Sequence, residues 1–403
     1  MRNNFLWGGL CLFAFLSPAV GQIDPEKRQL IQLGFNQPIE GKGPISGYAF
    51  YYRNDPDFFR TNITLRLAIA PIYVDSEIGL AHALGERTDL AFGIAGGGFA
   101  DSYSEVRQGK LKEEESFTGH GGEISSSIYH LFNPNNLIPL SGILRLSAHH
   151  TVYSEDSETS DVFELPQDRT SLNVRAGFRW GGREPVLRPD LGMEISAWYE
   201  GQFRTAHGDY GFNDDRAVRP SSHLFWMRTL FIYTLPELKH NFSLSMTAGT
   251  SLAADRFSSY RLGGVLPLIA EFPLSLPGYY FQEISARRFA LLNGQYVLPI
   301  DTEKRWHLAA HGTVAGVDYV SGLGQPGDVH SGVGMGVGYK SPKGWEILVG
   351  YSYGFDAIRS HGRGAQSIGL IFQYDLEARH RSGVLIDVDS PYKSRGLFRI
   401  LGQ

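Results

Sequence analysis

The side chains of this chain that could perform chemistry are histidines and carboxylates in polar segments. They occur as His120 in Gly119-His120-Gly121-Gly122-Glu123, as the neighbours His149 and His150, and as Asp214-Asp215-Arg216. A histidine that contacts a carboxylate or a serine can act as the general base of a hydrolase. None of these segments has a spacing that defines such a site, and adjacent strand residues point to opposite faces, so His149 and His150 cannot share a metal ion. We predict no catalytic residue, no metal site and no cofactor.

A row of glycines at every second position resembles a phosphate-binding loop only superficially. The row is Gly332, Gly334, Gly336 and Gly338, with large apolar residues between. A phosphate-binding turn must open a helix, whereas strict alternation predicts a strand with a bare glycine stripe on one face. We expect this stripe to face inward and to make room for another segment, for which the loop 255–283 is our candidate.

Charged side chains recur opposite rows of large apolar residues. The pattern places them on the inner face of a sheet whose other face is apolar. These predicted lumen-lining residues are Arg66, Arg145, Arg175, Arg179, Arg228, Arg287, Glu194, Glu200, Glu346 and Asp375. We expect them to pair with one another, and the alternative is a polar, weakly selective lumen through which small solutes diffuse.

Alternation with period two is the main pattern of the chain. In 63–69 the large apolar residues fill every odd position, and the same separation recurs in 172–180. Such segments, divided by turn residues, are typical of a barrel with one lipid face and one lumen face. The predicted strands are sixteen: 29–36, 43–53, 62–74, 76–85, 88–100, 116–132, 142–154, 171–181, 191–204, 223–235, 241–254, 284–300, 305–319, 331–340, 345–356 and 365–377.

The links between these segments alternate in length. From the fifth strand on, odd-to-even links are long and polar, as in 205–222 and 255–283, and even-to-odd links are shorter, as in 236–240 and 301–304. Short periplasmic turns and longer extracellular loops alternate in this way in bacterial barrels. We therefore predict an all-β fold, a transmembrane antiparallel β-barrel of about 16 strands, in preference to a soluble sandwich.

The first residues have the features of a secretory signal peptide. A basic start at Arg2 precedes the apolar run 5–16 and the small-residue end Ala19-Val20-Gly21. The predicted divisions are a signal peptide over 1–21, an outer-membrane barrel over 22–378 and a C-terminal periplasmic extension over 379–403. Because the single cysteine, Cys11, lies in the signal segment, we expect no disulfide. The net charge of −5 argues against a nucleic-acid partner.

One long loop and the strand after it carry a family resemblance. The residues are Tyr260-Arg261-Leu262-Gly263-Gly264, Leu276-Pro277-Gly278-Tyr279, Glu283 and Ala286 to Ile300, which includes Leu291-Leu292-Asn293. They resemble the bacterial surface antigen barrel of the outer-membrane insertase and two-partner-secretion superfamily. The resemblance implies a sixteen-stranded barrel whose loop folds back into the lumen through an Arg-Gly-Phe/Tyr element. It makes Gly263, Gly264, Gly278 and Tyr279 the candidates for that inward loop.

The chain departs from this family in two ways. Pro277 stands where the family has the arginine that anchors the loop, so the anchoring contact is in doubt. Only 23–28 separate the signal segment from the first strand, so we expect the barrel to lack the POTRA domains that capture clients. The basic residues of 379–403 could contact a periplasmic partner, although a loosely attached extension is the simpler interpretation.

The sequence thus predicts a non-enzymatic integral barrel of the outer membrane in a Gram-negative-type bacterium. Its role would lie in envelope assembly, structure or transport. Expected partners are outer-membrane lipid and lipopolysaccharide, and the barrel-assembly machinery during insertion. A passive diffusion porin is the first alternative, and a lipid-modifying or proteolytic enzyme that uses rim residues such as His120 or Asp214 is the second.

Overall fold

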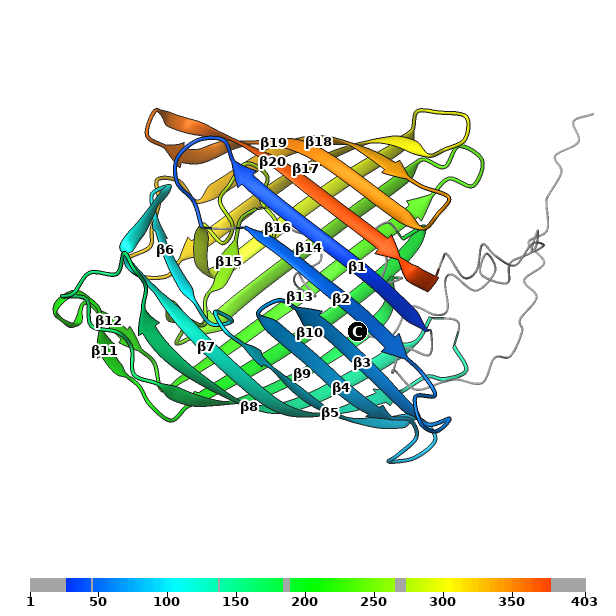
Figure 1. Cartoon of the computed structure of the whole chain (residues 1–403), viewed down its shortest axis with the longest axis horizontal. Coiled ribbons are helices and arrows are strands. Elements are labelled where there is room, and N and C mark those ends of the chain that lie inside the picture. The colour runs from blue at the N-terminus through cyan, green and yellow to red at the C-terminus, as the bar shows by residue number, and fades with distance from the viewer. Residues whose placement is uncertain (1–26, 45, 137, 184–188, 265–272, 378–403) are drawn as a thin grey trace, which may run out of the picture.

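Sixteen antiparallel strands close into a barrel in the computed structural model, which describes residues 27–377 except 45, 137, 184–188 and 265–272 (Figure 1). The predicted signal segment and the extension 379–403 lie outside the described residues. The barrel strands are β1 (Arg28–Pro38), β2 (Gly47–Asp55), β3 (Ile63–Ala70), β4 (Tyr73–Leu80), β5 (Thr88–Gly97), β7 (Lys110–Leu131), β8 (Leu140–Glu155), β9 (Arg169–Arg183), β10 (Leu191–Arg204), β13 (Ser221–Thr234), β14 (Asn241–Leu252), β16 (Ile284–Pro299), β17 (Trp306–Tyr319), β18 (Val329–Lys340), β19 (Trp345–Arg359) and β20 (Gly362–Asp375).

The first and last strands close the cylinder. β1 pairs with β20 in an antiparallel register that runs from Leu30 opposite Asp375 to Pro38 opposite Ser367. Side chains strengthen this seam, because the Gln32 amide donates to Gln373 Oε1 at 2.9 Å and the Tyr48 hydroxyl donates to Gln32 Oε1 at 3.0 Å. A closed ladder leaves no strand edge unpaired, which a spanning β-structure requires.

Large apolar side chains cover the outside of the cylinder. They are exposed at every second position, as in Phe225, Met227 and Phe231 of β13 and Leu244 and Met246 of β14. The residues between them face the lumen, as the period-two pattern predicts; on β14 they are polar, such as Ser243, Ser245 and Thr247, whereas on β13 they include Leu224 and Trp226 besides Arg228. In the part of the chain that the structure describes, no helix is long and apolar enough to span a membrane.

The links divide into two classes at the two ends of the barrel. At the end that we call outer, the links 98–109, 156–168, 205–220 and 253–283 contain the small elements β6 (Tyr103–Arg107), β11 (Gly208–Tyr210), η1 (Phe212–Asp214), β12 (Arg216–Val218) and β15 (Tyr260–Leu262). At the other end the links, such as 235–240 and 341–344, are uniformly short. In bacterial barrels the long links are extracellular, so the outer end corresponds to the cell surface.

The predicted boundary between the third and fourth strands is wrong. The turn consists of Pro71 and Ile72, and Asp75 lies within β4, opposite Ala68. Pro71 explains the position, because proline has the φ angle that a tight turn needs and no N–H for the ladder. The last outer link is also shorter than the predicted 357–364, because β19 continues to Arg359 and β20 begins at Gly362.

Arginine on the apolar outer face should destabilise the barrel according to its depth. We expect Met246→Arg, at the middle of β14, to cost about 2–4 kcal/mol, whereas Leu252→Arg, on the same face at the outer end of β14, should cost about 0–1 kcal/mol. Urea unfolding in lipid vesicles, followed by tryptophan fluorescence, measures both. Equal costs for the two variants would contradict the assignment of this face to lipid.

Candidate functional site

The loop 253–283, between β14 and β16, turns back into the lumen. After β15 the chain doubles on itself: the Gly263 N–H donates to the Leu274 carbonyl and the Leu276 N–H donates to the Gly264 carbonyl, both at 3.0 Å. Gly263 and Gly264 have φ angles of 138° and 67°, which side chains rarely adopt. The two glycines therefore give the loop its reversal, and they occupy the place that the sequence predicted.

The segment Pro277-Gly278-Tyr279 lies against the inner wall. The Gly278 N–H donates to Ser352 Oγ of β19 at 3.2 Å, and a Cβ on Gly278 would lie 2.7 Å from the Ala365 carbonyl oxygen of β20. The Tyr279 hydroxyl bonds to His330 Nδ1 of β18 at 3.0 Å. Gly278 therefore permits the closest approach of the loop to the wall.

A buried ion pair anchors the loop although Pro277 replaces the family's arginine. The cation comes from the wall: Arg359 of β19 contacts both carboxylate oxygens of Glu283 at 3.0 Å and donates to the Gly278 carbonyl at 3.2 Å. Its guanidinium also lies 3.7 Å from the centre of the Tyr280 ring. Burial raises the pKa of Glu283, and the Arg359 guanidinium offsets part of that rise. This chain therefore holds its loop through a wall arginine and a loop carboxylate, without a cation at position 277.

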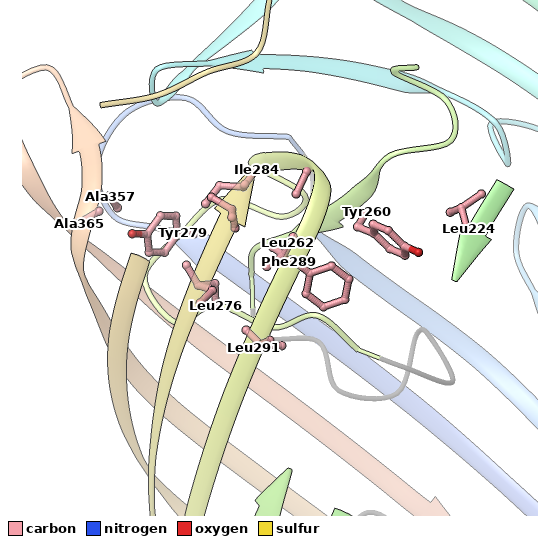
Figure 2. Packing of buried hydrophobic residues seen from close by; sticks show 13 residues of the cluster. Leu224, Tyr260, Leu262, Leu276, Tyr279, Ile284, Phe289, Leu291, Ala357 and Ala365 are labelled. Carbon is pink, nitrogen blue, oxygen red and sulfur yellow. The ribbon is translucent and has the colours of Figure 1, made fainter. Parts of the chain in front are cut away.

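Apolar packing fixes the rest of the loop (Figure 2). Leu262 and Leu276 are completely buried against β16, where Phe289 and Leu291 line the inner face. Figure 2 shows Tyr279 beside Ala357 of β19 and Ala365 of β20, two small residues that leave space for its ring. The described parts of the loop, 253–264 and 273–283, are thus held by apolar burial as well as by the ion pair.

The loop divides the lumen into two cavities. The outer chamber, of about 600 Å³, is lined by residues that include Asp101, His149, Arg169, Arg204, Arg256 and Arg261. The inner chamber, of about 220 Å³, is lined by apolar residues such as Leu230, Met335 and Leu348 together with neutral polar ones such as Ser245, Asn293 and Ser352. Pro273 and Ser275 line both chambers. Within the described residues, the segment 273–277 therefore lies between these two cavities.

The inward charges form paired ladders. Arg66 lies 3.6 Å from Glu77, and Arg145 connects Glu77, at 3.9 Å, to Glu123, at 2.7 Å. A second set centres on Glu194: Arg228 contacts it at 2.5 Å and Arg179 approaches to 3.8 Å. The remaining contacts in these sets are Arg175 to Glu200 at 3.6 Å and His307 to Glu346 at 3.7 Å.

Two predicted lumen residues lie away from these ladders. Arg287 occupies a β-bulge between Ala286 and Arg288, is more than half exposed and pairs with Asp318 at 2.8 Å near the outer end. The bulge shifts the alternation by one residue, so the assignment of Arg287 to the lumen wall does not fit the structure. Asp375 ends β20 at the seam and accepts a hydrogen bond from the Glu377 N–H at 3.0 Å.

The glycine stripe of β18 accommodates more than the loop. A Cβ on Gly332 would collide with the Pro277 carbonyl oxygen, which is the role predicted for the stripe. At Gly334 and Gly338, however, the added Cβ would collide with the imidazoles of His311 and His307 on β17. The stripe therefore makes space for two inward histidines as well as for the loop.

The predicted catalytic candidates do not assemble into a nucleophile and base. His120 is exposed and accepts a hydrogen bond from the Phe99 N–H, and His150 lies on the outer face. His149 does meet a carboxylate, since its Nε2 lies 2.6 Å from Asp101 Oδ2, but its Nδ1 faces a second carboxylate, Glu123, at 3.9 Å. Burial alone would raise the pKa of Asp101, but hydrogen bonds from His149 and Thr151 bring it below its usual value. This arrangement is an ion-pair network.

Sequence reasoning missed a charged cluster that joins the outer links into a cap. Glu105 of β6 and Glu115 of β7 are both buried and both contact Arg216 of β12, while Arg256 of the inward loop approaches Glu105 at 3.2 Å. Around them Tyr103, Phe117, Phe163 and Tyr210 form an aromatic core. Four links contribute to this cluster, so no local pattern could have predicted it.

Asp214 and Asp215 belong to the exposed edge of this cap. Asp214 is the exposed last residue of η1, and Asp215 follows it, where its Oδ1 contacts the Arg216 guanidinium at 3.2 Å and accepts a hydrogen bond from the Phe212 N–H at 3.0 Å. They therefore serve a turn and an ion pair. Among the described residues, no group of histidine, cysteine or acidic side chains has the geometry to hold a metal ion.

Solved outer-membrane barrels share this fold. CdiB from Acinetobacter baumannii aligns with a TM-score of 0.58 at 9% identity over 87% of this chain and 60% of that chain. CdiB from Escherichia coli aligns with a TM-score of 0.57 at 11% identity over 87% of this chain and 63% of that chain. BamA from Haemophilus ducreyi lacking POTRA domains 1-3 aligns with a TM-score of 0.56 at 10% identity over 87% of this chain and 71% of that chain. The chain thus spans less than two thirds of either CdiB chain. No protein-family model and no curated protein matches the sequence.

These comparisons confirm the predicted fold class and, at the level of the fold, the resemblance. The chain has a closed sixteen-stranded antiparallel barrel, the fold seen in the barrels of CdiB and BamA.

A methyl group at Gly278 should dislodge the loop. Gly278 and Gly322 share a φ of 80°, but the nearest neighbour of a Cβ on Gly322 is 3.5 Å away. Because the backbone strain is common to both, Gly278→Ala should cost about 1–3 kcal/mol more than Gly322→Ala through overpacking. Thermal unfolding in detergent and protease cleavage within 262–282 measure the difference. Indistinguishable variants would show that the loop does not depend on this contact.

Removal of the Arg216 guanidinium should open the cap without unfolding the barrel. Arg216→Met leaves Glu105 with Arg107 and Arg256, and Glu115 with Arg107, so the cost should stay below the value of about 3–5 kcal/mol for a buried charge that loses its last partner. We expect rapid protease cleavage within 205–220 and an intact barrel that still resists SDS without heating. The matched control is Arg219→Met, because the Arg219 side chain is exposed. Equal cleavage of the two variants would contradict the role of the buried cluster.

Proposed function

We propose that this chain is a non-enzymatic integral barrel of the bacterial outer membrane that is closed at rest by its inward loop. Its role would lie in transport or assembly at the envelope, and the loop would have to move before any substrate could pass. One observation carries this proposal, namely that the segment 273–277 lines both chambers and is fixed by the Arg359–Glu283 pair. A constitutively open diffusion porin does not fit a lumen divided in this way.

The cap supports the same proposal from the outer end. Its ion pairs and aromatic core join links 98–109, 156–168 and 205–220 to the inward loop through Arg256. Movement of the loop would therefore disturb the cap as well. The charge pairing along the wall further argues against a pore that selects small ions through unpaired side chains.

Conductance in a planar lipid bilayer tests whether the loop closes the barrel. We expect the intact chain to be silent, and we expect both Arg359→Met and deletion of 262–282 to produce steady current steps. Loss of Arg359 leaves Glu283 buried without its cation, which should destabilise the loop position by about 3–5 kcal/mol.

The matched control for this experiment is Arg363→Met. Arg363 is also an outer-end arginine of the last hairpin, but it is 60% exposed and lies 3.8 Å from Asp356. The Arg363→Met variant should show no current steps. Large steady conductance of the intact chain would overturn the closed barrel in favour of the porin, and turnover of a lipid or peptide substrate that depends on His149 or Asp101 would favour the enzyme.

A further inference from the structure

One side of the barrel wall is much lower than the rest. β3 and β4 have 8 residues each, whereas β7 has 22 and β8 has 16. An eight-residue strand tilted by about 45° spans only about 19 Å, against an apolar band of about 25 Å in outer-membrane barrels. Figure 1 shows the β3–β4 hairpin ending well short of the outer end that β6 and β7 reach. We call β3, β4 and their turn the low wall.

The tip of the low wall is apolar and exposed. Ile72 of the turn is 54% exposed, and Ile69 and Val74 beside it are also exposed, whereas Tyr73 shares the lumen side of β4 with Asp75 and Glu77. An extracellular turn is normally polar because it projects into water. This composition suits a turn that stays within the hydrocarbon region and contacts lipid chains on its outer side.

The outer chamber lies directly behind this tip. Tyr73 pairs with Gly97 at the end of β5, and the link that follows carries Phe99, which is 57% exposed. Two residues further on, Asp101 lines the chamber and bonds to His149 and Thr151 of β8. The apolar tip and the charged chamber are thus neighbours at the outer end.

The chamber wall carries two arginines that pair with no carboxylate among the described residues. Arg169 is 94% buried, its guanidinium lies 4.1 Å from the Phe257 ring centre, and its Nη1 has no hydrogen-bond partner within the described chain. Arg261 lies over the Tyr103 ring at 4.9 Å and donates only to backbone carbonyls, those of Ser104 and Gln282. The other lining arginines, Arg204 and Arg256, are neutralised by Asp255 and Glu105.

We propose that the low wall and the outer chamber together bind an anionic amphiphile of the outer leaflet. Its phosphate or carboxylate group lies in the chamber near Arg169 and Arg261, and its hydrocarbon chain lies against Ile72 and the exposed residues beside it. The buried cations supply the counter-charge, and the low wall allows the chain to remain in the bilayer while the charged group enters the barrel.

Binding of fluorescent short-chain phosphatidylglycerol to the full chain in neutral detergent micelles tests this proposal, with the matching phosphatidylcholine as the zwitterionic comparison. We expect phosphatidylglycerol to bind about tenfold more tightly, equivalent to about 1.4 kcal/mol. Arg169→Gln and Arg261→Gln should each reduce that preference, whereas Arg363→Gln, at an exposed arginine outside the chamber, should leave it unchanged.

Two further measurements distinguish binding of a lipid from binding of a free anion. Ile72→Asp should weaken both lipids, whereas Val329→Asp, at an equally exposed apolar residue of the outer end of β18, should weaken neither. Inorganic phosphate should compete only weakly, because it lacks the chain. The proposal is overturned by equal affinity for the two lipids, by arginine variants that keep the preference, or by full competition from phosphate together with an unaffected Ile72→Asp variant.

Discussion

Every backbone N–H and C=O inside a bilayer must find a partner within the protein, and the rest of this structure follows from that requirement. It forces β1 to meet β20, so the first and last strands of the chain complete one ladder. An even number of antiparallel strands then brings the start of β1 and the end of β20 to one end of the barrel and places alternate links at opposite ends. Only the outer links are long, and they build the cap and the inward loop.

Closure creates a second requirement, because a sixteen-stranded cylinder encloses polar wall groups that need partners. The chain meets it in two ways. The wall side chains pair across strands, as Arg145 does with Glu77 and Glu123, and the loop 253–283 occupies the space that remains. A buried ion pair such as Arg359–Glu283 contributes little net stability, because desolvation offsets its attraction. Its effect is on specificity: any other loop position would leave both charges buried and unpaired.

The sequence was sufficient to predict the features that depend on local alternation, namely the strands and the faces on which their side chains lie. Sixteen strands and the inward side of residues such as Arg66, Arg179 and Glu194 follow from period two alone. The failures occur where a local feature interrupts that period. Pro71, and not Asp75, makes the third turn, and the bulge beside Arg287 reverses its expected face. Pro71 is a local turn signal that the continuing alternation obscured, whereas the bulge depends on pairing with β17, which a single segment does not encode.

Contacts between residues far apart in the chain could not be predicted from the sequence for a different reason. Arg359 and Glu283 are 76 residues apart, and they meet only because the loop crosses the lumen to the wall of β18, β19 and β20. The family pattern placed the anchoring cation on the loop, and Pro277 removed it, so the motif indicated an inward loop without its partner. The glycines were better guides, because Gly263, Gly264 and Gly278 occupy backbone conformations or close approaches that only glycine tolerates.

The uneven height of the wall and the length of the inward loop are best understood together. The shortest outer link with an apolar tip, Pro71-Ile72, joins the third and fourth strands, and the inward loop joins the eleventh and twelfth, half of the way around the sixteen-stranded cylinder. A low wall by itself would expose the polar lumen to hydrocarbon at the height where β3 and β4 end. The outer chamber lies behind that gap and the cap and the long loop border it, so the polar groups there face the chamber. Closure of the lumen and shortening of the wall are thus two parts of one arrangement, and each is tolerable because the other is present.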